Sequence, residues 1–242
     1  MAAGLMDYVC HDLESCEAHR AEAVRIYREL GYRREFAWAT TALSVSRGLQ
    51  SLDMLGPAIE LGQQGVALLR ELDDLPLLAH LLNSMGILYN HYGDKRAAYE
   101  EALKIAIQIG DREREFYQYY NLGYVSLLEG NYQQAEALFW KYLDYALEFD
   151  LKPMVAEDLF ALAGVFGLQG HNLRAARLMG AAECFMENFR VLFVPGDQKD
   201  FERSKTGVRE QMGERLFEAT WAEGRQMSLE QAIEYARGKT LT

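Results

Sequence analysis

The chain has 242 residues, of which 50% are hydrophobic and 25% are charged, and its formal net charge at pH 7 is -11. This composition supports a folded core and excludes a wholly disordered chain, while the negative charge opposes binding to nucleic-acid phosphates or anionic lipid. No apolar run approaches the roughly 18 residues of a membrane span, and acidic residues stand where a secretion signal needs basic ones. We therefore expect a cytoplasmic protein. The three cysteines (Cys10, Cys16 and Cys184) are scattered and odd in number, which favours reduced thiols over a disulfide framework.

Three glycines, Gly56, Gly93 and Gly130, recur at intervals of 37 residues. The residues around the last two also match, since Gly86 precedes Gly93 by the same step as Gly123 precedes Gly130. Apolar residues recur at three- and four-residue steps, as in amphipathic helices. The pattern predicts a tandem helix-turn-helix repeat in which small residues let paired helices approach closely.

Helical segments can be placed in chain order. By periodicity alone, the first pair covers about residues 7–30 and 34–50, and the repeat there is too degenerate to align. A helix from about Pro57 to Leu72 follows, with proline suited to its first turn. The later helices form three pairs with the approximate ranges 75–92 and 95–109, 112–129 and 132–149, and 153–169 and 172–188.

Capping residues mark several of these boundaries. We expect Gly110 to end a helix before Asp111 caps the next one, and Asn131 to form a capping box with Gln134. The stretch from Val191 to Val194 is the nearest approach to a strand signal. Because it is short and is followed by Pro195 and Gly196, we interpret it as an extended connector.

Beyond Pro195 the pattern changes to three shorter amphipathic segments, at about residues 198–213, 214–223 and 229–237. Ser228 and Gln231 predict a capping box at the last of them. A repeat array needs a cap over its final apolar face, so we expect residues 1–190 to form the array and residues 191–242 to form capping helices.

Several positions resemble the tetratricopeptide repeat, whose signature places glycine, aromatic residues and alanine at fixed steps. Tyr89, Ala98, Tyr132, Ala135 and Phe139 fit this signature. The departures are the period of 37 residues and the usual tryptophan position, which holds Leu82 or Tyr119. The resemblance implies an all-α fold, a right-handed α-α superhelix of helix pairs.

Two runs in the C-terminal third, Ala175–Glu183 and Met212–Ala232, resemble the end of the repeat region in bacterial LuxR-type and related signal-transduction ATPase regulators. In that family the repeats follow an ATPase domain and receive a protein or small-molecule signal. The resemblance implies a sensor or scaffold part of a transcriptional regulator. Its partners would be a peptide, a protein such as the ATPase domain of the same regulator, or a small effector.

The repeat resemblance also places one stripe of each first helix on an inner, concave wall. Aromatic rings and carboxamides on such a wall suit a peptide, since amides can bond its backbone and rings can cover its side chains. The alternative is that these residues only pack neighbouring helices. The candidate ligand-binding residues are Asn83, Ile87, Asn90, His91, Tyr117, Tyr120, Asn121 and Tyr124.

Patterns that would indicate chemistry are weak. Cys10, His11, Cys16 and His19 lack a Cys-x2-Cys pair, so we expect no zinc site. Gly238-Lys-Thr240 matches the end of a phosphate-binding loop, but the glycine required earlier is Ile233. We therefore expect no catalytic residues, no metal and no cofactor. The function that we expect is a binding module, and the alternative is a purely structural adaptor or homodimerisation scaffold.

Overall fold

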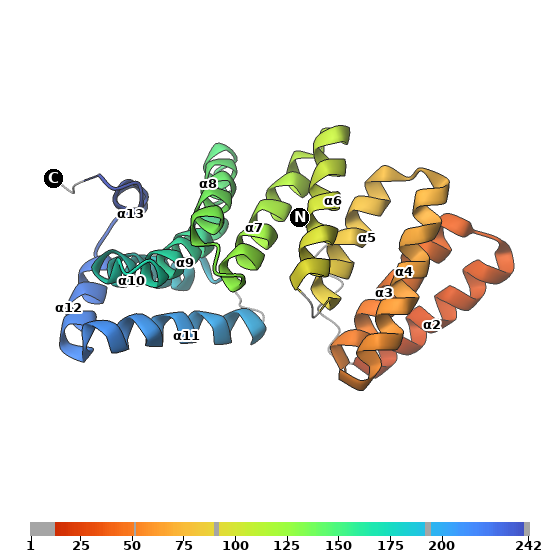
Figure 1. The fold of residues 1–242 in the computed structure, drawn as a ribbon, viewed down its shortest axis with the longest axis horizontal. Coiled ribbons are helices and arrows are strands. Elements are labelled where there is room, and N and C mark those ends of the chain that lie inside the picture. Colours follow the sequence, from red (N-terminus) through yellow and green to blue (C-terminus); the bar gives the residue numbers. More distant parts are fainter. Residues whose placement is uncertain (1–12, 51, 90–91, 192–194, 240–242) are drawn as a thin grey trace. The chain divides into compact units, whose positions relative to one another are not determined.

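The computed structural model describes residues 13–50, 52–89, 92–191 and 195–239, and within these ranges it contains helices and no strand (Figure 1). The helices follow one another in packed pairs, which confirms the prediction of an all-α repeat fold. Contacts divide the chain into two compact units, Met1–Val125 and Ser126–Thr242.

The first unit is built from six helices and a short 3-10 turn, and the last of its helices ends three residues beyond the unit's boundary. Their bounds are α2 (Leu13–Leu30), α3 (Arg33–Gln50), η1 (Leu52–Met54), α4 (Leu55–Leu72), α5 (Leu75–Leu88), α6 (Tyr92–Ile109) and α7 (Arg112–Leu128).

The core of the first unit lies between α3, α4, α5 and α6. Its most deeply buried side chains include Leu69, Leu81 and Met85. Small residues let the helices approach closely: a Cβ added to Gly65 would lie 2.7 Å from the carbonyl oxygen of Ala37. The same principle explains Gly86, where an added Cβ would overlap the ring of Tyr99. The predicted role of glycine at this position is therefore confirmed.

The structure supplies the register that the sequence left open in the first 55 residues. Ser44 lies 42 residues before Gly86, is fully buried, and donates a hydrogen bond to the carbonyl of Ala58 on α4 (2.5 Å). Ser44 thus occupies in α3 the place of Gly86 in α5. It follows that α3 is the first helix of a pair with α4, although the segment 34–50 was expected to pair with 7–30. The pairing was missed because serine replaces the diagnostic glycine.

Left-handed residues end five successive helices at steps of 20 residues. They are Gly110, Gly130, Asp150, Gly170 and Arg190, with φ between 51° and 85°. At each, the following N–H bonds a carbonyl five residues earlier, as in the Schellman motif. Consequently α7 begins 37 residues after α5, but α9 begins 40 residues after α7.

The three equally spaced glycines are not structurally equivalent. Gly56 lies inside α4 and Gly93 lies inside α6, whereas Gly130 has φ of 79° in a turn. The spacing that first suggested a repeat therefore coincides with the true repeat at Gly130 only.

This turn geometry predicts opposite effects for matched substitutions. Gly170→Ala places a Cβ at φ of 85° and should cost about 1 kcal/mol of unfolding free energy, while Arg190→Gly should stabilise by about 0.5–1 kcal/mol. As a control, Gly207→Ala lies in a helix with open space around the new Cβ and should stabilise by roughly 0.5–1 kcal/mol. Urea unfolding of the three variants checks the order, and equal effects of Gly170→Ala and Gly207→Ala would contradict it.

Most predicted caps are present. The N–H of Arg114 donates to Asp111 Oδ1 (3.0 Å), and Ser228 forms both bonds of a capping box with Gln231 (3.2 and 2.8 Å). The box predicted at Asn131 is wrong: Asn131 is the N-cap residue of α8, but its side chain makes no cap and donates to Glu129 instead. Pro57 lies in the first turn of α4. Most of the predicted 191–194 connector lies outside the described residues.

The second unit adds six helices after the end of α7. Their bounds are α8 (Tyr132–Glu148), α9 (Lys152–Leu168), α10 (Asn172–Phe189), α11 (Pro195–Met212), α12 (Glu214–Gly224) and α13 (Leu229–Ala236). In this unit α8, α10, α11 and α13 all pack against α9, while α12 packs against α10. The aromatic side chains Phe139 and Tyr142 of α8 are buried, as expected for core residues.

Helix α11 continues the stack of first helices. A Cβ on Gly167 of α9 would lie 2.6 Å from Val208 of α11, just as a Cβ on Gly48 of α3 would lie 2.6 Å from Leu88 of α5. The expected boundary near residue 190 thus falls within one compact unit, and the division into array and cap stays a prediction.

Candidate binding site

Three first helices of the first unit present the same stripe of side chains at steps i, i+3, i+4 and i+7, which share one face of a helix. On α5 this stripe lies beside the buried face formed by Leu78, Leu81, Leu82 and Met85. We call the three sets the inner stripes; they are Trp38, Thr41, Ala42 and Val45 on α3, His80, Asn83, Ser84 and Ile87 on α5, and Tyr117, Tyr120, Asn121 and Tyr124 on α7.

The α3 and α5 stripes enclose a pocket of about 70 Å³, which Arg20 of α2 and Leu81 also line. Arg20 is oriented along one side, because its guanidinium donates to Ser46 Oγ and to the carbonyl of Ala42. Trp38 is 41% exposed at the pocket. The lining mixes apolar side chains with hydroxyl, amide and imidazole groups and contains no carboxylate.

A carboxamide cluster joins α5 to α7 beside this pocket. Asn83 Oδ1 accepts hydrogen bonds from Gln118 Nε2 (3.0 Å) and Asn121 Nδ2 (2.8 Å). Gln118 is only 2% exposed, whereas Asn83 and Asn121 are half-buried. With Asn83 Oδ1 twice engaged, the cluster keeps the amide N–H groups of Asn83 and the carbonyl oxygen of Asn121 for a ligand.

The aromatic candidates lie further along α7. The rings of Tyr120 and Tyr124 meet edge to face with centroids 4.9 Å apart, and Tyr117 packs edge-on against the buried Phe116 (5.1 Å). Neighbouring Tyr119 donates to Glu115, and burial together with this carboxylate raises the pKa of Tyr119 to about 12. These phenols are therefore protonated hydrogen-bonding groups at neutral pH.

The structure thus brings together some of the predicted residues. Asn83 and Asn121 are bonded, Ile87 lines the pocket with Asn83, and Tyr117, Tyr120 and Tyr124 share the α7 stripe. Asn90 and His91 lie outside the described residues. Sequence reasoning missed Gln118, and the signal was available: Gln118 and Asn121 are two carboxamides one helical turn apart.

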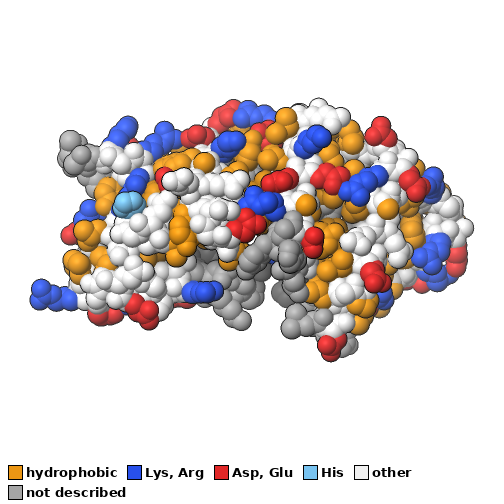
Figure 2. Space-filling model, in the orientation of Figure 1, with side chains coloured by type: hydrophobic (Ala, Val, Ile, Leu, Met, Phe, Trp, Pro, Cys, Tyr) orange, Lys and Arg blue, Asp and Glu red, His pale blue; other side chains and the backbone are white. Residues whose placement is uncertain are grey.

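The surroundings offer hydrogen bonding and apolar contact rather than chemistry. On the face seen in Figure 2, acidic and basic side chains are interspersed. Among the described residues, no group of three or more His, Cys, Asp or Glu side chains could hold a metal ion. Cys10 and His11 of the zinc alternative lie outside those residues. No helix in the described part of the chain is long and apolar enough to cross a membrane.

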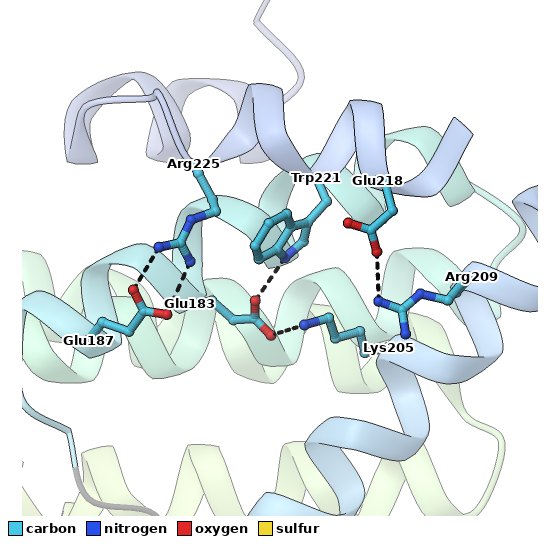
Figure 3. Close-up of polar contacts among 7 residues, drawn as sticks. All are labelled: Glu183, Glu187, Lys205, Arg209, Glu218, Trp221 and Arg225. Carbon is cyan, nitrogen blue, oxygen red and sulfur yellow. Dashed lines mark hydrogen bonds and ion pairs between the residues drawn. The ribbon is translucent and has the colours of Figure 1, made fainter. Parts of the chain in front are cut away.

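A second polar cluster lies in the second unit, where the two runs that resemble regulator sequences meet (Figure 3). Glu183 of α10 accepts from Trp221 Nε1 (2.8 Å) and from Lys205 Nζ (2.6 Å). Arg225 makes two bonds to Glu187 (3.1 and 2.7 Å), and this holds the pKa of Glu187 below its usual value. Lys205 and Arg225 also lie 5.0 and 4.9 Å from the Trp221 ring.

Beneath this cluster, two glycines bring the backbones of α10 and α12 together. A Cβ on Gly180 would overlap the carbonyl oxygen of Trp221, and a Cβ on Gly224 would overlap that of Arg177. We call this crossing, with the bonds of Glu183 and Glu187, the α10–α12 junction. Because both carboxylates are bonded within the junction, we interpret these runs as packing elements rather than as a ligand site.

Comparisons with known proteins agree with a repeat fold in a regulatory context. A stretch of 76 residues is 36% identical to proteins named as HTH-type transcriptional regulators in Mycobacterium tuberculosis, strain H37Rv (Rv0890c), and in Mycobacterium bovis. The match covers 31% of this chain and 9% of those proteins, so the chain corresponds to a small part of their length. No family model matches the chain.

Among solved structures, the chain is similar to BtubC (BKLC) from P. vanneervenii. The TM-score is 0.67 over 96% of this chain and 95% of BtubC, at 19% sequence identity. At this identity the likeness concerns the fold alone, and it supports the arrangement of successive helix pairs.

Proposed function

We propose that the chain is a non-enzymatic binding module of the tetratricopeptide type, the sensor or scaffold part of a bacterial transcriptional regulator. Its inner stripes on α3, α5 and α7 bind an extended polypeptide segment. The observation that carries the proposal is the carboxamide cluster of Asn83, Gln118 and Asn121 beside an apolar-lined pocket.

The size of the pocket favours a polypeptide over a free effector. Pockets that enclose small molecules typically span about 300–1,000 Å³, whereas this one holds about 70 Å³. Such a volume accommodates one aliphatic side chain between Val45 and Ile87. The amides of Asn83 and Asn121 are then placed to pair with the backbone on either side of that residue.

The regulatory part of the proposal rests on the partial similarity to HTH-type transcriptional regulators and on the residues of the two C-terminal runs. A bound segment would act only through different affinities for two conformations of the repeat array. The segment could belong to an ATPase domain of the same regulator or to a separate protein in the cytoplasm.

A structural scaffold is the alternative, and one observation favours it. Three large apolar side chains at the start of the first unit, Ile26, Leu30 and Tyr32, are 38%, 58% and 54% exposed. A cluster of this kind suits a homodimer contact. Sedimentation that shows a dimer, together with a groove that binds no peptide, would favour this reading.

The proposal is tested by selecting a random heptapeptide display library on the purified chain and measuring the best peptide by fluorescence anisotropy. Asn83→Ala should weaken binding at least tenfold, about 1.4 kcal/mol, because it removes the residue that links the cluster. Asn188→Ala, which removes a carboxamide bonded only weakly to Cys184 in the second unit, is the matched control. Equal affinity of both variants for the peptide would contradict the proposed site.

A further inference from the structure

Asp158 is a carboxylic acid at the centre of the second unit with no polar partner. It lies in the middle of α9, its exposed fraction is 0%, and neither carboxyl oxygen has a hydrogen-bond partner. A buried ionised carboxylate without a partner is far more costly than a neutral one. The local geometry therefore favours the protonated acid.

The elements packed against α9 bring no cation to Asp158. From α10, Arg174 bonds the carbonyl of Ala236 and stacks on Phe166, and from α11, Lys205 bonds Glu183. Tyr235 of α13 accepts from Arg177 of α10, and Arg237, just after α13, pairs with Asp144 of α8 (2.7 Å). The titratable groups around α9 are thus engaged with one another.

The charges that do act on Asp158 are carboxylates, those of Glu157 and Asp144. Burial is the larger cause and these two charges add to it, so the pKa of Asp158 is raised well above its ordinary value. All three effects oppose ionisation, and none is offset by a donor.

The preceding repeat shows what this position ordinarily holds. Gln118 is the seventh residue of α7, and Asp158 is the seventh residue of α9. Both are buried, but Gln118 is a permanently neutral amide and Asp158 can lose a proton. The same place in the repeat therefore carries a titratable group only in the second unit.

We propose that Asp158 makes the second unit a proton-sensitive element: the unit packs around the neutral acid, and loss of the proton loosens the packing of α9 against its neighbours. The peptide-binding stripes lie in the first unit, so this property is independent of the proposed function. It would make the stability of the part that contains α10, α12 and α13 dependent on pH.

The sign follows from the raised pKa. The contribution of Asp158 to stability is fully present below the unfolded-state pKa of about 3.9, declines as the pH rises above it, and is lost once the pH passes the folded-state pKa. Within that window the folding equilibrium constant should fall by up to about tenfold per pH unit because of this group.

The test compares urea unfolding of the full chain with that of Asp158→Asn and Asp150→Asn from pH 4.5 to 8.5. Relative to wild type, Asp158→Asn should gain stability steadily as the pH rises, while Asp150→Asn, an exposed Asp-to-Asn control, should follow wild type. A constant ratio between wild type and Asp158→Asn across this range would overturn the proposal.

A second measurement decides the question without any variant. In the wild-type chain, the carboxyl carbon resonance of Asp158 should still report the protonated acid at pH 5.5, when exposed aspartates are ionised. Titration of that resonance with a midpoint near 4 would overturn the proposal, even if Asp158→Asn failed to fold.

Discussion

Gly224→Ala is expected to destabilise the second unit by about 3 kcal/mol, at the upper end of the cost of overpacking. The new Cβ would overlap the carbonyl oxygen of Arg177, and its next neighbours would also be backbone atoms of α10. A flexible side chain could rotate away, but two helix backbones can separate only by breaking the α10–α12 junction. Thermal and urea unfolding of the purified variant measure the loss.

Gly164→Ala is the matched control for Gly224→Ala. Gly164 is also a buried helical glycine of the second unit, but an added Cβ would make an ordinary contact of 3.7 Å with Ser204. It should leave stability within about 1 kcal/mol of wild type. If Gly224→Ala were as stable as Gly164→Ala, the close crossing of α10 and α12 would be wrong.

Phe217→Ala is expected to cost about 3–5 kcal/mol, the usual effect of emptying a buried phenylalanine site. Phe217 of α12 is 0% exposed, and the guanidinium of Arg209 lies 4.7 Å from its ring. A loss of this size would show that α12 is part of the core of the second unit rather than an appended segment. Circular dichroism during urea unfolding gives the free energy.

The adjacent residue provides the control for Phe217. Leu216 is 51% exposed, so Leu216→Ala should change stability by no more than about 0.5 kcal/mol. Similar losses for the two variants would mean that α12 faces α10 with a different side.

Much of the fold was predictable because helix periodicity and caps are local properties of the sequence. The helices that begin at Leu75, Arg112 and Glu214 follow from apolar spacing and from residues such as Asp111 and Ser228. The register of α3 was not predictable, because Ser44 replaces the glycine by which the repeat is aligned. Gly56 and Gly93 misled the alignment for the converse reason, since a glycine inside the first turn of a helix looks the same in sequence as one in a turn.

The candidate site was predictable in part. Asn83 and Asn121 could be placed on one wall because both fall at the same steps of the repeat. That Asn83 would link to Gln118 depends on how α5 packs against α7, which no local pattern encodes. The same limit applies to Gly180 and Gly224: the sequence shows a resemblance at both, but only the tertiary structure reveals that each faces the backbone of the other's helix.

The central claim is that the inner stripes of the first unit bind a polypeptide segment. The most direct test is hydrogen–deuterium exchange of the full chain with and without a saturating amount of the selected heptapeptide. The account predicts slower exchange in α3, α5 and α7 around Val45, Asn83 and Asn121, with the α10–α12 junction unchanged. Protection confined to α10 and α12, or none in α5, would contradict it.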